Sequence, residues 1–231
     1  MVLTRICTPT YFPTILSECF SRLALALSGI EYEDERIAFD QWADMKPKMP
    51  FGQLPVLRID DGPMQTQSMA MLRWVGTQST SQLYPTGDTD AMYRVEEALG
   101  VVEEFRNSWS PCLYITRNPV AYGHPEGYFG TDEGKAKLKE IREYWTANTF
   151  PKFAKHLESL LAKHDNQWLA SSTTGPTIAD CVAVVFLRGF TRGHIDHVPT
   201  TLLDSHPALV DYIKRFCALD GVKGRYTDGL H

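Results

Sequence analysis

Residues 50–57, Pro-Phe-Gly-Gln-Leu-Pro-Val-Leu, have the composition of a loop that could hold a peptide backbone. A glycine follows an aromatic residue and a proline leads into an apolar run, which predicts a loop that becomes a strand at Pro55. Because proline lacks an N–H, Leu54-Pro55 is a candidate cis peptide that would leave the N–H and C=O of Leu54 free. Two such neighbouring groups can pair with a bound peptide as an added strand would.

A second candidate contact follows about ten residues later, at Gln67-Ser68. The apolar residues after it recur at helical spacing: Met69, Met71, Leu72 and Val75. A serine at the start of a helix offers an anion its hydroxyl, its N–H and the positive end of the helix dipole. We call residues 50–57 the clamp, because their backbone could pair with a peptide, and Gln67-Ser68 the carboxylate socket. Both lie in one short stretch, which predicts a short peptide ligand.

These segments, with three others near the N-terminus, resemble the cytosolic glutathione S-transferases, and in particular their sigma-like, tyrosine-dependent branch. The N-terminal segments are Thr10-Tyr11-Phe12-Pro13, Arg22-Leu23-Ala24-Leu25-Ala26 and Gly29-Ile30-Glu31-Tyr32-Glu33-Asp34. The resemblance covers essentially the whole chain and is sharpest in residues 10–77. It implies a homodimeric, cytoplasmic detoxification enzyme that conjugates the co-substrate glutathione to small hydrophobic electrophiles.

By this resemblance Tyr11 is the catalytic residue. An ordinary thiol has a pKa of about 8.5, and a tyrosine hydroxyl that donates to the sulfur favours the nucleophilic thiolate. The family pattern continues with Gly-Arg-Ala-Glu, whereas this chain reads Leu16-Ser17-Glu18-Cys19. Ser17 therefore stands where relatives carry an arginine that polarises the tyrosine, and Glu18 or Arg22 would have to compensate.

The resemblance also assigns contacts to the glycine end and the middle of glutathione. Trp42 and Lys46 would meet the glycine end, with the lysine pairing its carboxylate. Gln53 and Leu54 would hold the cysteinyl backbone, next to Pro55. Without the resemblance, the sequence predicts only that Trp42 is an aromatic residue covering the surface and that Lys46 is a solvated cation.

The γ-glutamyl end of glutathione is assigned to residues of two subunits. Gln67 and Ser68 would bind its carboxylate. Glu103, from the partner of a two-fold dimer, would reach its amine, although a pair of acids such as Glu103-Glu104 in mid-helix is also typical of a solvated face. On this interpretation the complete site exists only in the dimer.

Two other functions remain open. Cys7 could act as the nucleophile of a glutathione-dependent thiol reductase if it lay at the start of a helix, where the dipole lowers a thiol pKa. Alternatively, the protein could bind glutathione or another ligand on the same fold without activating the thiol, as the missing arginine indicates. The histidines show no metal-binding spacing, so no metal is expected.

The elements that would position these residues predict an α/β thioredoxin-like domain over 1–80, a linker over 81–89 and an all-α domain over 90–231. The first domain is predicted as strands 6–12 and 32–39 around a helix at 14–28, an irregular segment at 41–50, a hairpin of 54–59 and 63–66, and a helix from Ser68. The second is predicted as helices at 90–109, 132–147, 150–164, 181–190 and 206–218, with a loop at 119–131. Thr177 and Asp180 would form a capping box before the apolar run 181–190. Phe105, Trp109 and Tyr114 are candidates either for the electrophile pocket or for the core.

The bulk composition is that of an ordinary globular protein, with 43% hydrophobic and 22% charged residues among 231. A net charge of −5 gives no reason to expect nucleic acid or an acidic membrane as a partner. The five cysteines are scattered, which favours a reducing compartment over a disulfide framework. No apolar run approaches the ~20 residues of a membrane span, and cytosol is the default prediction.

Overall fold

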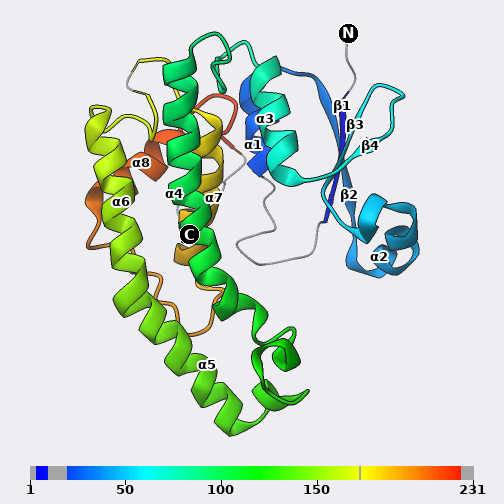
Figure 1. The fold of residues 1–231 in the computed structure, drawn as a ribbon, viewed down its shortest axis with the longest axis vertical. Helices are drawn as coiled ribbons and strands as arrows, with labels where there is room; N and C mark the ends of the chain where they lie inside the picture. The colour runs from blue at the N-terminus through cyan, green and yellow to red at the C-terminus, as the bar shows by residue number, and fades with distance from the viewer. Residues whose placement is uncertain (1–3, 10–19, 172, 225–231) are drawn as a thin grey trace.

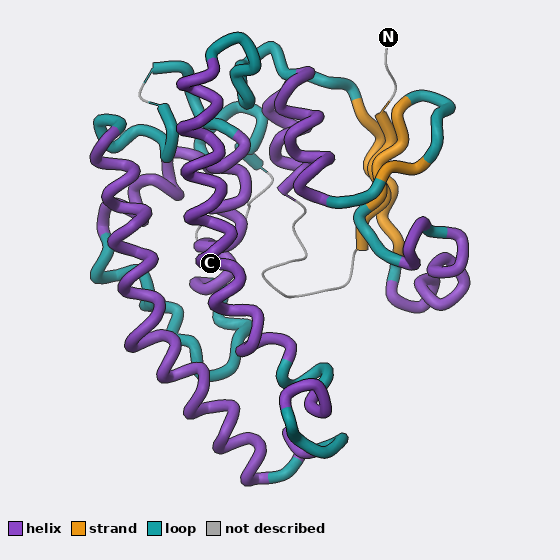
Figure 2. The backbone as a smooth tube through the Cα atoms, viewed as in Figure 1, coloured by secondary structure: helices purple, strands orange, loops and turns teal. Residues whose placement is uncertain are grey.

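The computed structural model describes residues 4–9, 20–171 and 173–224, and it has a small unit containing all described strands beside a larger helical unit (Figures 1 and 2). Strands β1 (Thr4–Pro9), β2 (Tyr32–Ile37), β3 (Val56–Ile59) and β4 (Met64–Gln65) form one sheet in the order β2-β1-β3-β4. Strand β1 runs parallel to β2 and antiparallel to β3, and β3 runs antiparallel to β4. The predicted βαβ and ββ succession is therefore confirmed.

Helices α1 (Phe20–Ser28) and α3 (Ser68–Gln78) lie side by side between the sheet and the helical unit (Figure 1). Several of their apolar residues are fully buried, among them Leu25 and Leu72. Helix α3 begins at the predicted serine. The first part of the predicted helix 14–28 lies outside the described residues.

The segment expected to be irregular at 41–50 instead contains helix α2 (Phe39–Met45) and two 3₁₀ turns, Lys46–Lys48 and Pro50–Gly52. The side chain of Gln41 accepts a hydrogen bond from the N–H of Ala38 at 3.0 Å and closes the first turn. Helix α2 packs Trp42 and Met45 against a small separate cluster of buried residues, which are Ile37, Met49 and Val56. This tertiary packing stabilises a helix that its polar composition did not indicate.

The helical unit begins with α4 (Thr89–Tyr114), which continues five residues beyond the predicted end at 109. Asp88 caps it by accepting from the N–H groups of Asp90 and Ala91. The helix passes through Pro111, because Trp109 and Cys112 on either side are buried and hold it in place by packing. Local propensity alone would have ended the helix here.

The helices predicted at 132–147 and 150–164 form one continuous rod, visible as α5 and α6 in Figure 1. Helix α5 (Asp132–Tyr144) leads through a π turn (Trp145–Thr149) directly into α6 (Phe150–Lys163). Because Pro151 has no N–H, the ordinary i to i−4 bonding cannot continue there, and the wider turn absorbs the mismatch. The prediction of two separate helices was wrong in this respect.

Helix α7 (Ile178–Thr191) is the central helix of this unit, and every residue of it is buried, as its apolar run predicted. Helix α8 (Pro207–Cys217) packs against α6 and α7. Between α6 and α7, aromatic rings form a dense core: Phe105, Trp109, Trp145, Phe150, Phe186 and Phe190. Among the described helices, none is both long and apolar enough to cross a membrane.

The boundary between the two units is short and ordered. Helix α3 ends at Gln78 and α4 begins at Thr89, and between them Leu83 is fully buried and its C=O accepts from the N–H of Ile178 at 3.0 Å. We propose that 1–80 and 90–231 are the two domains and that 81–89 is a linker, which this hydrogen bond attaches to α7.

Candidate functional site

The Leu54-Pro55 peptide bond is cis, as the sequence predicted. Strand β3 starts directly after it, at Val56. Within the described residues, neither the N–H nor the C=O of Leu54 has a hydrogen-bond partner. A donor and an acceptor therefore lie next to each other at the edge of β3, available for the backbone of a bound peptide.

The loop before this bond turns through two residues with positive φ, Phe51 (φ 55°) and Gly52 (φ 59°). The side chain of Lys46 lies along this turn, since a Cβ added to Gly52 would lie 3.4 Å from both Cγ and Cε of the lysine. Glycine at position 52 therefore serves both the backbone conformation and the close approach of Lys46. The cation Lys46 therefore lies at the loop that carries Gln53 and Leu54. Trp42 is half-buried and packs in the small cluster around Val56.

Gln67 is the residue immediately before α3 and has φ 70° and ψ 98°. Its C=O accepts the first helical hydrogen bond, from the N–H of Met71 at 3.0 Å. The Gln67 side chain does not cap the helix and is exposed, as a ligand-binding side chain requires. The C=O of Ser68 accepts a hydrogen bond at 3.5 Å from the hydroxyl of Ser21, which is buried in α1.

Glu103 lies in α4 and is half-buried, whereas Glu104 is exposed. Its charge raises the pKa of Arg73 in α3 and that of Arg106, although burial leaves the pKa of Arg106 lowered overall. The guanidinium of Arg106 lies 5.4 Å from the ring centroid of Phe20 in α1. Two cations of the same chain, Arg73 in α3 and Arg106 in α4, therefore interact electrostatically with Glu103, which sequence patterns did not indicate.

A second connection between the domains was missed entirely by the sequence analysis. Arg73 donates twice to the carboxylate of Glu96, from Nε at 2.8 Å and from Nη2 at 2.7 Å. The hydroxyl of Tyr84 donates to the same carboxylate at 2.8 Å. The hydrogen bond from Arg73 lowers the pKa of Glu96, while burial and the bond to Glu96 raise the pKa of Tyr84.

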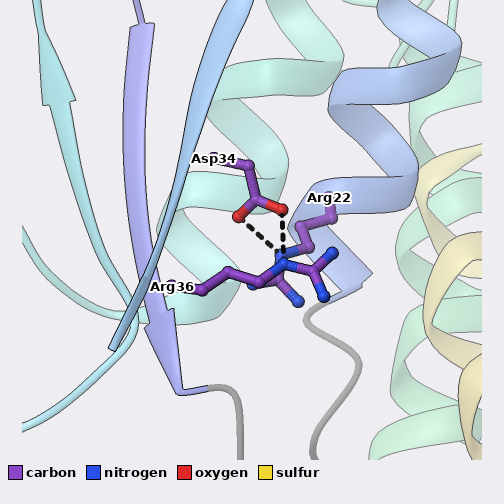
Figure 3. Close-up of polar contacts among 3 residues, drawn as sticks. All are labelled: Arg22, Asp34 and Arg36. Carbon is purple, nitrogen blue, oxygen red and sulfur yellow. Dashed lines mark hydrogen bonds and ion pairs between the residues drawn. The ribbon is translucent and has the colours of Figure 1, made fainter. Parts of the chain in front are cut away.

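Arg22, which the sequence analysis named as a possible substitute for the missing arginine, lies in the first turn of α1 as described (Figure 3). Its Nε lies 3.0 Å from one carboxylate oxygen of Asp34 in β2, and Nε of Arg36 lies 3.1 Å from the other. The Nη2 atom of Arg22 is buried and has no hydrogen-bond partner in the part of the chain that the structure describes. One donor of this guanidinium is therefore left for a further partner.

Of the candidate nucleophiles, Tyr11 lies outside the described residues, as do Ser17 and Glu18. Cys7 lies within strand β1, where its Cα pairs with those of Glu35 and Val56. The reductase interpretation needs a cysteine at the start of a helix, and the backbone position of Cys7 does not meet that requirement.

Two of the candidate lining residues are core residues. Phe105 and Trp109 are almost fully buried and contact Trp145 and Phe190, which decides between the two interpretations that the sequence left open. Tyr114, at the end of α4, is 41% exposed and remains a candidate. No group of three His, Cys, Asp or Glu side chains that could hold a metal occurs among the described residues.

Comparisons with known proteins identify the family. A model described as "Glutathione S-transferase, N-terminal domain" matches residues 21–78, and one described as "Glutathione S-transferase, C-terminal domain" matches residues 125–225. Glutathione S-transferase 1 of Ascaris suum is 28% identical over 207 residues, which are 88% of this chain and 86% of that protein. The class-mu 28 kDa isozyme of Schistosoma japonicum is 35% identical over 97 residues, only 40% of this chain and 45% of that protein.

Solved structures share the whole fold. Prostaglandin synthase D of Nilaparvata lugens has a TM-score of 0.73 at 18% identity and covers 98% of this chain and 97% of its own. The glutathione S-transferase of Ascaris lumbricoides has a TM-score of 0.65 at 23% identity, with 98% and 96% covered. The chain belongs to the glutathione S-transferase family, whose enzymes use glutathione as co-substrate. The predicted architecture, a thioredoxin-like domain followed by a helical domain, is confirmed.

Proposed function

We propose that this protein conjugates the thiolate of glutathione to small hydrophobic electrophiles, with the Tyr11 hydroxyl stabilising the thiolate as in the sigma-like branch. The observation that carries the proposal is that the N–H and C=O of Leu54, just before strand β3, have no hydrogen-bond partner within the described residues. Those groups can bind the cysteinyl residue of glutathione as a short antiparallel strand. The sulfur is then held at one position relative to the first domain.

The charges around this clamp match the two ends of glutathione. Lys46, which lies along the clamp loop, would pair with the glycine carboxylate. At the other end, the free N–H groups in the first turn of α3, with the Ser68 hydroxyl and the Gln67 side chain, would bind the γ-glutamyl carboxylate. Trp42, which packs in the small cluster together with Leu54, would contact the glycine end beside Lys46.

The γ-glutamyl amine needs an anion, and we propose Glu103 of a second subunit. Glu103 is half-buried in α4, and its charge acts on Arg73 and Arg106 of its own chain. A charged Glu103 can pair with an ammonium group at a two-fold interface. We therefore propose a cytoplasmic homodimer in which each site contains a residue of both subunits.

A catalytically weak glutathione-binding protein is the second candidate function. It is favoured by Ser17 in place of arginine and by the ion pair that holds Arg22 to Asp34. The unpartnered Nη2 of Arg22 favours the enzyme instead, because a buried donor of this kind can support a tyrosine hydroxyl or a thiolate.

The pH dependence of the ultraviolet absorbance of enzyme-bound thiolate distinguishes these functions. With an active enzyme, the pKa of bound glutathione lies well below the free value of about 8.5, and Tyr11→Phe raises it again. Cys7→Ser serves as the control and should leave it unchanged. Binding without a lowered pKa, or a lowered pKa that persists in Tyr11→Phe, would rule out the tyrosine mechanism.

A further inference from the structure

A cavity of about 460 Å³ lies near the end of α3 that is opposite Ser68, and the proposed function does not use it. Four segments meet around it: the linker after α3, the first turns of α4, the end of α6 and the loop before α7. In Figure 1 the linker crosses the upper end of the molecule. Ser68 begins α3 and the linker follows its end, so the 11-residue helix separates the two places by about 16 Å.

Arg94 is the principal charge of this cavity, which we call the linker cavity. The residue lies in α4, is half-buried and lines the space. Within the described part of the chain its guanidinium has neither a hydrogen-bond nor an ion-pair partner. A partly desolvated guanidinium without a partner is a binding group for an oxyanion, which it can hold through two parallel hydrogen bonds.

A hydroxyl donor comes from the loop before α7, where Ser171 and Thr174 line the cavity. The Ser171 Oγ accepts from the N–H groups of Thr173 at 3.3 Å and Thr174 at 3.1 Å, and it lies 2.6 Å from Oγ1 of Thr174. Because both lone pairs of the serine oxygen are engaged, its proton goes to Thr174. The proton of the Thr174 hydroxyl then has no acceptor among the described residues, and the hydroxyl lines the cavity.

His164, at the end of α6, provides a third donor, an imidazole N–H. Burial, then Arg94 and Lys163, lower its pKa, and these cations outweigh the opposing charges of Asp180 and Glu97. Asp88 also lines the cavity, and its Oδ1 accepts from two N–H groups at the start of α4. Asp180 accepts four hydrogen bonds at the start of α7, and Glu97 lies 3.8 Å from Lys163. Each of these carboxylates therefore has a hydrogen-bond donor or a cation of its own among the described residues.

We propose that the linker cavity binds a small phosphate ester, whose phosphate contacts Arg94, His164 and Thr174. Three donor groups from three segments suit the three terminal oxygens of a phosphate monoester better than the two of a carboxylate. The cavity is several times larger than a phosphate, and Gln82 and Thr173 add polar groups to its wall. The remaining volume therefore fits a hydroxylated organic body.

Isothermal titration calorimetry in a phosphate-free buffer tests this site, with glucose 6-phosphate and glycerol 3-phosphate as probes and glucose and inorganic phosphate for comparison. At least one ester should bind at least tenfold more tightly than either comparison compound. Arg94→Gln should weaken that binding by about 10- to 100-fold, because it removes a charged hydrogen-bond donor. Thr174→Val should weaken it by a smaller factor.

Two control variants test whether the loss of affinity is specific to Arg94. Lys152→Gln makes the same change of charge at an exposed position near the start of α6, and it should leave the affinity unchanged. Lys46→Gln, in the proposed glutathione site, should do the same. The thermal unfolding midpoint of each variant confirms that it is folded. The assignment is overturned if neither ester binds, if inorganic phosphate binds as tightly as the esters, or if folded Arg94→Gln binds them like the wild type.

Discussion

The Nη2 atom of Arg73 lies 2.7 Å from Oε2 of Glu96, and this ion pair joins α3 of the first domain to α4 of the second. A second bond from Nε makes the pair bidentate, and Tyr84 in the linker donates to the same carboxylate. One carboxylate thus receives donors from both sides of the domain boundary. The arrangement holds α3, whose first residues form the proposed carboxylate socket, against the helical domain.

Replacing Arg73 with Gln should lower the free energy of unfolding by about 1 kcal/mol, because both side chains are 36% exposed and water screens the pair. Urea denaturation of the two proteins measures the difference. Lys139→Gln breaks an exposed pair within α5, with Nζ 3.8 Å from Glu143, and should change stability far less. Equal effects of the two substitutions would show that the Arg73 pair does not hold the domains together.

The contribution of this pair should also depend on pH. The hydrogen bond from Arg73 lowers the pKa of Glu96 in the folded state, below the unfolded value of about 4.3. The folded state therefore favours the ionised form, so the stabilisation is present above that unfolded pKa and is lost as the pH falls through the lower folded pKa. Glu96→Gln should be less stable than the wild type at pH 7, and the difference should shrink below about pH 4.

Lys46→Gln should raise the KM for glutathione about tenfold and leave kcat nearly unchanged, because the lysine would bind a part of the substrate remote from the sulfur. Steady-state kinetics with varied glutathione measures both constants. Lys48→Gln, two residues away on the same turn and exposed, is the matched control and should behave like the wild type. A fall in kcat alone would contradict a role in binding the glycine carboxylate.

Glu103→Gln should weaken glutathione binding about tenfold, because it removes the charge proposed to pair with the γ-glutamyl amine, whereas the exposed Glu104→Gln should not. Equilibrium dialysis of glutathione against each variant separates the two. Sedimentation of the wild type and both variants reports whether each forms the proposed dimer. Identical affinities for the two variants, both dimeric, would remove Glu103 from the site.

Asp180→Ala should destabilise the protein by about 3–5 kcal/mol, because it leaves several buried donors without an acceptor. The carboxylate is fully buried and accepts from the N–H groups of Leu169 and Thr177 and from the hydroxyls of Thr177 and Tyr212. Tyr212→Phe removes one of these donors and should cost about 1 kcal/mol. Thermal unfolding compares both variants, and a shift for Asp180→Ala no larger than that for Tyr212→Phe would refute the assignment.

Features that depend on neighbouring residues were readable from the sequence. The cis Leu54-Pro55 bond follows from the proline at the start of an apolar strand, and the start of α3 at Ser68 follows from a serine before a helical pattern. The capping box of Thr177 and Asp180 was predicted for the same reason, because its two partners are only three residues apart. Helix spacing likewise identified α7 as the buried centre of the second domain.

Features that join distant segments were decided only by the tertiary structure. Arg73 and Glu96 are 23 residues apart, and nothing in the local pattern of either shows that they meet. The merger of α5 and α6, the burial of Trp109 and the linker cavity around Arg94 depend on how helices pack, because burial and cavities arise from several segments at once. The sequence by itself determined the order of the elements and the residues that could bind a peptide. Packing decided which charges face one another.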